Sequence, residues 1–104
     1  MESLKCYHAH IYYDGSSFDL ASKLCDEVGA LFDVPVGFNG PHPMWSCQIS
    51  LKAEKFAEVV PWLMLNRQGL TVFIHANTGD DLKDHTEHTM WMGSMQPLNL
   101  DIFL

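Results

Sequence analysis

Histidine is the residue whose type and spacing most strongly suggest chemistry in this chain. The sequence contains six histidines, and His8 and His10 occupy alternate positions of a segment rich in aromatic and polar residues. Alternate side chains of a strand share one face at a spacing of roughly 6.6 Å, and neighbouring strands lie about 4.8 Å apart. Imidazoles on adjacent strands can therefore converge on one metal ion. His75, in the last expected strand, is the third candidate ligand.

The other histidines lie in segments that we expect to be loops. His42 lies between two prolines, which restrict the backbone and hold the imidazole in a defined place. His85 and His88 follow several aspartates, with Glu87 between them. A rigid turn and a solvated acidic loop are the simpler interpretations of these segments, and a lone histidine on a strand is usually an ordinary polar residue. The number of histidines taken together favours a metal site.

The kinds of side chain narrow the choice of metal without fixing it. Imidazole suits iron, zinc, copper and nickel, whereas two histidines and one carboxylate with open positions suit iron(II) that activates oxygen. The carboxylate could come from Glu87 or from an aspartate. The spacing does not choose between them.

Periodicity predicts the elements that position these histidines. In residues 5–13, Ala9 and Ile11 alternate with His8 and His10, which is typical of a strand with one apolar face. The other expected elements are a helix that follows Ser17 and fades near Gly29, a strand at 34–38, a strand at 45–51, a helix at 53–67 that Pro61 kinks or divides, and a strand at 70–76.

This order predicts an α+β fold, a ferredoxin-like βαββαβ sandwich in which a four-stranded antiparallel sheet carries its helices on one face. We expect one domain over residues 1–104. The first and last strands are then antiparallel neighbours, so His75 lies closer to His8 than to Tyr12. Because Val72 and Ile74 should pack under the helices, Phe73 and His75 should point to the open face.

Charge and hydropathy restrict the partners of the protein. Thirteen acidic side chains against six basic ones give a net charge of −7, which repels phosphate backbones and anionic lipids. The longest apolar run, residues 59–65, is too short to span a bilayer, and the first residues show no secretory pattern. We expect a cytoplasmic protein that binds neither nucleic acid nor membranes.

The cysteines indicate neither a disulfide framework nor a zinc ribbon. Cys6, Cys25 and Cys47 are odd in number, widely separated and outside any CxxC spacing. We therefore expect three reduced thiols.

Several ordered segments resemble the DOPA 4,5-dioxygenase family, and the similarity runs through nearly the whole chain. They are residues 7–13 (YHAHIYY), 40–43 (GPHP), 60–67 (VPWLMLNR), 69–70 (GL), 74–80 (IHANTGD), 84–86 (DHT) and 91–93 (WMG). The resemblance implies a ferredoxin-like fold and the use of iron(II) and oxygen to open a catechol ring. Its motif positions include the histidines His8, His10, His42, His75 and His85.

On this basis we assign His8, His10 and His75 to the metal, which is Fe(II) or, in a purified sample, zinc or another divalent ion. His42 and His85 are assigned to proton transfer and substrate orientation. The expected substrates are O2 and a small aromatic catechol. Because Arg67 is the only arginine, a clamp for an amino-acid carboxylate is hard to find, which favours a simpler catechol over DOPA.

A second hypothesis is a non-enzymatic ferredoxin-like dimer whose open sheet face is a metal-binding or assembly surface. Such a face would leave aromatic side chains such as Phe73 and Tyr12 for a second subunit to bury. We expect a homodimer under either hypothesis.

Overall fold

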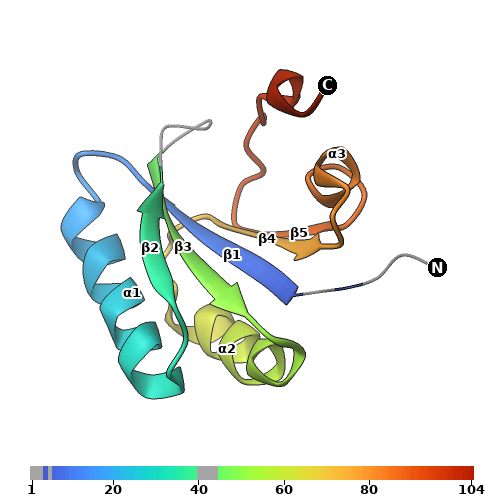
Figure 1. Cartoon of the computed structure of the whole chain (residues 1–104). Helices are drawn as coiled ribbons and strands as arrows, with labels where there is room; N and C mark the ends of the chain where they lie inside the picture. The colour runs from blue at the N-terminus through green and yellow to red at the C-terminus, as the bar shows by residue number, and fades with distance from the viewer. Residues whose placement is uncertain (1–3, 5, 40–44) are drawn as a thin grey trace.

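The computed structural model describes residue 4, residues 6–39 and residues 45–104 (Figure 1). The elements are β1 (Cys6–Tyr13), α1 (Phe18–Phe32), β2 (Val36–Asn39), β3 (Trp45–Leu51), α2 (Ala53–Asn66), β4 (Val72–Asn77), α3 (Asp81–Asp84), β5 (Thr89–Met92) and the 3-10 helix η1 (Leu100–Phe103). No helix in these ranges is long and apolar enough to cross a membrane.

The strands form one antiparallel sheet in the order β2-β3-β1-β4-β5. The expected α+β class is confirmed, but the expected four-stranded sheet is wrong because β5 adds a fifth strand beside β4. This strand has only four residues, and Met90 on it is exposed. So short an edge strand shows little alternation in sequence and is defined by its pairing with β4.

Helices α1 and α2 lie together against one face of the sheet, as Figure 1 shows. Ala9 and Ile11 of β1 and Val72 and Ile74 of β4 point into this layer and are buried, as their alternation predicts. The helical residues that complete this core include Ala21, Leu24, Cys25, Val28, Val59, Val60 and Leu63.

Helix α2 includes Pro61 and continues to Asn66 as one element, so the second short helix considered from sequence does not form. The helix is followed by two residues in the left-handed region, Gln68 (φ 51°) and Gly69 (φ 80°). The Arg67 Nη1 atom donates a hydrogen bond of 2.8 Å to the Leu70 carbonyl oxygen across this turn. The only arginine of the chain therefore stabilises the connection into β4.

The face opposite the two large helices is not open, in contrast to the sequence-based expectation. Helix α3 and the C-terminal η1 lie on this side of the sheet (Figure 1). Phe73 and Tyr12, which we expected to be exposed, are 1% and 4% accessible. Trp91 on the unexpected strand β5 stacks on both rings.

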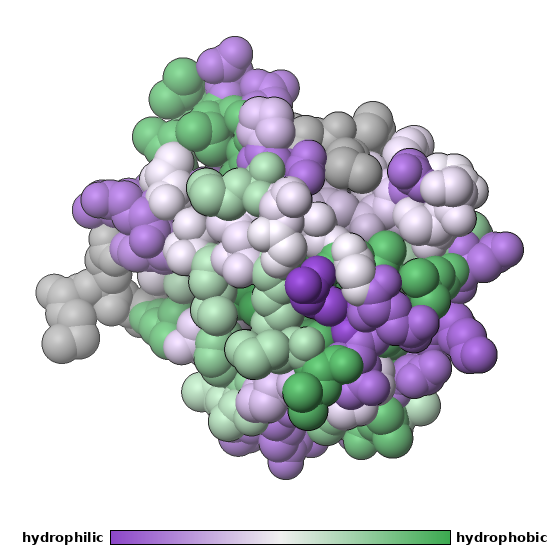
Figure 2. All heavy atoms as spheres, turned by 180° about the vertical axis from the view of Figure 1, so that it is seen from behind, coloured by the Kyte–Doolittle hydropathy of each residue, from purple (hydrophilic) through white to green (hydrophobic). Residues whose placement is uncertain are grey.

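We expected a homodimer because a second subunit would bury the rings of Phe73 and Tyr12. This reason is wrong, since both rings are already buried within one chain. The exposed large apolar side chains lie elsewhere. In the view of Figure 2, hydrophobic residues gather at the upper left over the C-terminal segment, where Ile102 and Leu104 are exposed. The homodimer itself stays a prediction.

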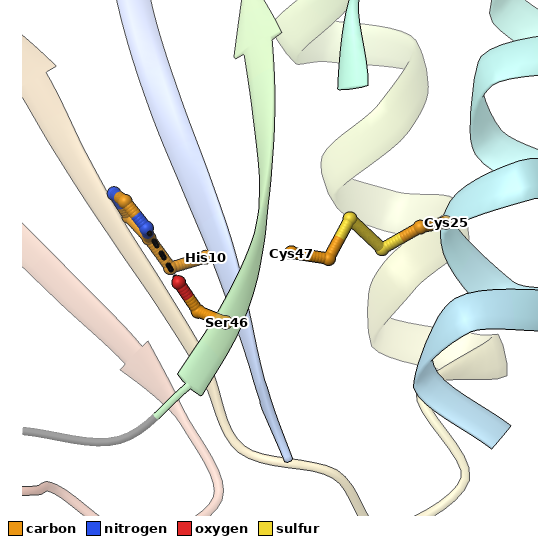
Figure 3. The surroundings of a disulfide bond; sticks show 4 residues. All are labelled: His10, Cys25, Ser46 and Cys47. Carbon is orange, nitrogen blue, oxygen red and sulfur yellow. Dashed lines mark hydrogen bonds between the residues drawn. A yellow bond between two sulfur atoms is a disulfide. The ribbon is translucent and has the colours of Figure 1, made fainter. Parts of the chain in front are cut away.

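Cys25 of α1 and Cys47 of β3 form a disulfide bond (Figure 3). The expectation of three reduced thiols is wrong for this pair, and only Cys6 is a free cysteine. Sequence spacing could not reveal the bond, since the two residues are 22 positions apart and meet only when α1 packs on the sheet. The bond fixes the first helix to a central strand inside the core.

We expect reduction of this disulfide to lower the free energy of unfolding by about 3 kcal/mol, because the cross-link restricts a loop of this length in the unfolded chain. Urea denaturation of oxidised and reduced protein measures the difference. Thiol titration in denaturant should find one thiol before reduction and three afterwards. Cys6→Ser is the matched control and should retain the full response to reduction. Three thiols in the unreduced protein would contradict the bond.

Candidate functional site

The strand register brings three of the predicted histidines together. His8 of β1 lies directly opposite His75 of β4, and His10 follows two positions along on the same face of β1. One ring nitrogen from each of these residues lies within 4.8 Å of the other two. Within the ranges that the structure describes, this is the group of side chains with the geometry to hold a metal ion.

Hydrogen bonds orient the rings of His75 and His10. The His75 Nδ1 atom donates to the Ala76 carbonyl oxygen at 2.8 Å, so in the neutral ring the lone pair is on Nε2. The Nε2 atoms of His10 and His75 lie 3.3 Å apart, and His10 Nδ1 lies 3.2 Å from the Ser46 hydroxyl (Figure 3). The two Nε2 atoms therefore face each other across the place where an ion would be shared.

Burial lowers the pKa values of His75 and His8, which keeps both imidazoles neutral at physiological pH. His75 is 4% accessible, and burial, with smaller contributions from His85 and His8, lowers its pKa to about 4 although its bond to Ala76 opposes the shift. The pKa of His8 is also lowered, mainly by burial and further by His85. A neutral imidazole is the form that binds metal, so His75 need not lose a proton at pH 7 in order to act as a ligand.

Comparison with known proteins identifies the family of the chain. The model of the Dopa 4,5-dioxygenase family matches residues 7–102, which includes all three histidines. The chain belongs to the Dopa 4,5-dioxygenase family. It is 35% identical to a DOPA 4,5-dioxygenase of Amanita muscaria over 93% of its own length and 49% of that protein.

Two further relatives extend this comparison. An uncharacterised 21.2 kDa protein of Botryotinia fuckeliana is 37% identical over 61% of the chain and 39% of its own length. The chain thus spans half or less of the length of these curated relatives. A solved structure from Nostoc punctiforme, described as a "putative dioxygenase", is 39% identical, with a TM-score of 0.89 over 94% of this chain and 90% of that one.

In this member of the Dopa 4,5-dioxygenase family, a fourth predicted histidine lies beside the cluster. The His85 ring centroid is 4.3 Å from that of His75 and 4.3 Å from that of Phe103 in η1. Its Nδ1 atom donates to the Asp81 carbonyl oxygen at 2.7 Å, which leaves the lone pair on Nε2. His85 is therefore held beside His75 by its bond to Asp81 and by its contact with Phe103. His42, also assigned a role from sequence, lies outside the described residues.

The carboxylates considered as ligands do not join the cluster. Glu87 is exposed and is not part of the potential metal-binding group. Asp84 is buried and accepts hydrogen bonds from Thr78 and, at 2.9 Å, from His88 Nδ1. Burial acts to raise the pKa of Asp84, but these hydrogen bonds together lower it. Asp84 thus stabilises the segment between β4 and β5, a role that the aspartate-rich sequence did not indicate.

An aromatic wall formed by Tyr12, Phe73 and Trp91 lies beside the histidines, and of these three residues sequence reasoning missed only Trp91. The Phe73 and Trp91 ring centroids are 4.4 Å apart, and the Phe73 ring lies 6.0 Å from that of His10. Burial raises the pKa of Tyr12 to about 12, so its hydroxyl stays protonated. Because the strand that carries Trp91 was not predicted, this residue could have been found from sequence only through the family motif at residues 91–93.

A hollow of about 460 Å³ lies beside β4 and β5, and its lining includes residues from both faces of the sheet. Tyr7, Ile74 and Met90 in its lining belong to the helix-covered face, whereas the side chains of His8 and His10 point the opposite way. His75 is the only member of the cluster that borders this hollow. We therefore locate the candidate site at the histidines and the aromatic wall.

We expect the metal-free protein to lose stability as the pH falls from about 6.5 to about 4. In this window His75 binds a proton in the unfolded chain but not in the folded one, so the free energy of unfolding falls with pH, by up to about 3 kcal/mol. Urea denaturation in the presence of a chelator measures it. His75→Gln should flatten the difference between pH 7 and pH 4.5, and an unchanged difference in that variant would contradict the assignment.

Proposed function

We propose that this chain is an extradiol ring-cleaving dioxygenase that uses Fe(II) and O2 on a catechol-type substrate. The observation that carries the proposal is the convergence of one ring nitrogen from each of three imidazoles in a member of the Dopa 4,5-dioxygenase family. The names of two relatives support the proposal that the chain is an oxygenase. The histidine cluster supports the proposal that this oxygenase depends on a metal ion.

The residues present fit a divalent metal ion. His8, His10 and His75 would hold it through one nitrogen each, and three protein ligands leave further positions for exogenous groups. Imidazole ligands suit iron and equally zinc, so Fe(II) is proposed from the family's chemistry. When bound, such an ion would supply electron transfer between a catechol and oxygen and would orient both reactants.

The surrounding residues would bind the ring and move its protons. The Nε2 lone pair of His85 is available to accept a proton from a catechol hydroxyl, because its Nδ1 is held by Asp81. We assign His42 to the same kind of step from its family motif alone. Trp91 stacks on the buried Phe73 ring and is itself only partly buried, so it offers a stacking surface for a planar substrate.

We further propose a substrate without a carboxylate. Arg67 is engaged by the Leu70 carbonyl at the end of α2. The segment that precedes His85 is acidic and contains Asp80, Asp81 and Asp84. The negative charge of Asp84 interacts electrostatically with His75. A simple catechol avoids the cost of burying an uncompensated carboxylate here.

Several broader features remain part of this proposal. The order β2-β3-β1-β4 supports a ferredoxin-like unit with β5 added at its edge. We propose one domain over residues 1–104, a homodimer and a cytoplasmic location. The alternative of a non-enzymatic assembly module loses its main support, because Tyr12 and Phe73 are already buried.

Substitutions should separate metal ligands from proton carriers. We expect His8→Ala and His75→Ala to lose both bound iron and ring cleavage, because each removes one of three ligands. His85→Ala and His42→Ala should keep their iron and lose roughly 10²–10⁴-fold in rate, the usual contribution of a general acid or base. Elemental analysis and oxygen uptake on the same samples decide the matter.

Ser50→Ala is the matched control for this series, since Ser50 lies opposite His8 on β3 and should keep both iron and activity. If His85→Ala lost its iron while His75→Ala kept iron and full activity, the roles would be assigned to the wrong residues. A wild-type chain that folds without binding any metal would favour the assembly module.

Substrate preference should follow from the engagement of Arg67 by the Leu70 carbonyl and from the acidic residues that precede His85. We expect kcat/KM for dopamine to exceed that for DOPA by about tenfold or more, because a tenfold ratio corresponds to only about 1.4 kcal/mol of uncompensated carboxylate desolvation. The two compounds share the catechol and the amine, so the comparison isolates the carboxylate. Anaerobic reconstitution with Fe(II) followed by oxygen uptake provides the measurement, and a preference for DOPA would contradict the substrate assignment.

A further inference from the structure

We propose that Ser46 is a positioning residue that allows His10 to change tautomer when a metal ion binds. This inference rests on the proposed metal site and adds to it a residue that neither the sequence motifs nor the comparisons single out. Ser46 is on β3, beside β1, and is 3% accessible. Its hydroxyl lies 3.2 Å from His10 Nδ1 and is joined to it in Figure 3.

Without a metal, the hydrogen-bond network determines the His10 tautomer. The neutral His75 ring has its proton on Nδ1, which donates to the Ala76 carbonyl, so its Nε2 can only accept. His10 Nε2 lies 3.3 Å from that atom and must therefore be the donor. A neutral His10 then has an unprotonated Nδ1, which accepts a hydrogen bond from the Ser46 hydroxyl.

A metal ion reverses these roles at His10. If Nε2 binds the ion, the proton of the neutral ring must be on Nδ1, which becomes a donor. A backbone carbonyl can only accept a hydrogen bond, so it could pair with Nδ1 only in the metal-bound state. A backbone N–H can only donate, so it could pair with Nδ1 only in the metal-free state. The hydroxyl of Ser46 can both donate and accept, so it satisfies His10 in both states without moving the strand.

The low accessibility of Ser46 makes this partnership important for metal affinity. Ser46→Ala would remove this partner of His10 Nδ1 in both states. The cost would be larger with a metal bound, because the ion makes Nδ1–H a stronger donor and hydrogen bonds to charged groups contribute more than neutral ones. Loss of a hydrogen-bond partner behind a ligand histidine typically lowers metal affinity by about 10–100-fold. Ser46 would thus favour metal binding through His10 without contacting the ion.

Zinc affinity, measured by competition with a chromophoric chelator, tests the proposal. We expect Ser46→Ala to bind zinc about 10–100-fold more weakly than wild type, and Ser46→Thr, which keeps the hydroxyl, to recover most of the affinity. Ser50→Ala is the matched control, because Ser50 lies four residues along the same strand, opposite His8, and should bind zinc as wild type does. Wild-type affinity in Ser46→Ala would overturn the proposal.

Nitrogen NMR of the wild-type chain tests the tautomers directly and does not depend on how any variant folds. The His10 proton should be on Nε2 in the metal-free protein and on Nδ1 with zinc bound, whereas His75 should keep its proton on Nδ1 in both states. A His10 tautomer that is the same in both states would overturn the inference while leaving the metal site intact. A wild-type chain that binds no zinc would overturn the metal site itself and this inference with it.

Discussion

The candidate site depends on the register between β1 and β4. His8 pairs with His75 because Ala9 and Ile11 on one strand and Val72 and Ile74 on the other all pack under α1 and α2. A shift of one residue would move each apolar set to the wrong face of the sheet. The hydrophobic core therefore determines, through the alternation of each strand, which imidazoles meet on the opposite face.

Bringing these histidines together has an energetic cost that the surroundings reduce. Burial lowers the pKa values of His8 and His75, which indicates that positive charge is disfavoured here. Hydrogen bonds to the Ala76 carbonyl and the Ser46 hydroxyl satisfy the Nδ1 atoms of His75 and His10. The arrangement is thus oriented before any ligand arrives, which reduces the ordering cost of binding.

Segments far from the central strands complete the environment of the site. The connection between β4 and β5 carries His85, and its shape depends on the buried Asp84, which accepts hydrogen bonds from Thr78 and His88. The C-terminal η1 adds Phe103, which stacks on His85. Because these residues follow β4 in sequence, the last quarter of the chain converts a polar sheet surface into a partly enclosed one.

Local periodicity was enough to predict the α+β class, the two large helices, the first four strands and the face on which His8, His10 and His75 lie. Three further features became visible only in the folded chain: β5 extends the sheet, Trp91 and α3 cover the face expected to be open, and Cys25 meets Cys47. The folded chain also places Ser46 behind His10 and Glu87 apart from the cluster. Each of these features joins residues distant in sequence, whose contact depends on packing and strand pairing and leaves no periodic pattern in the chain.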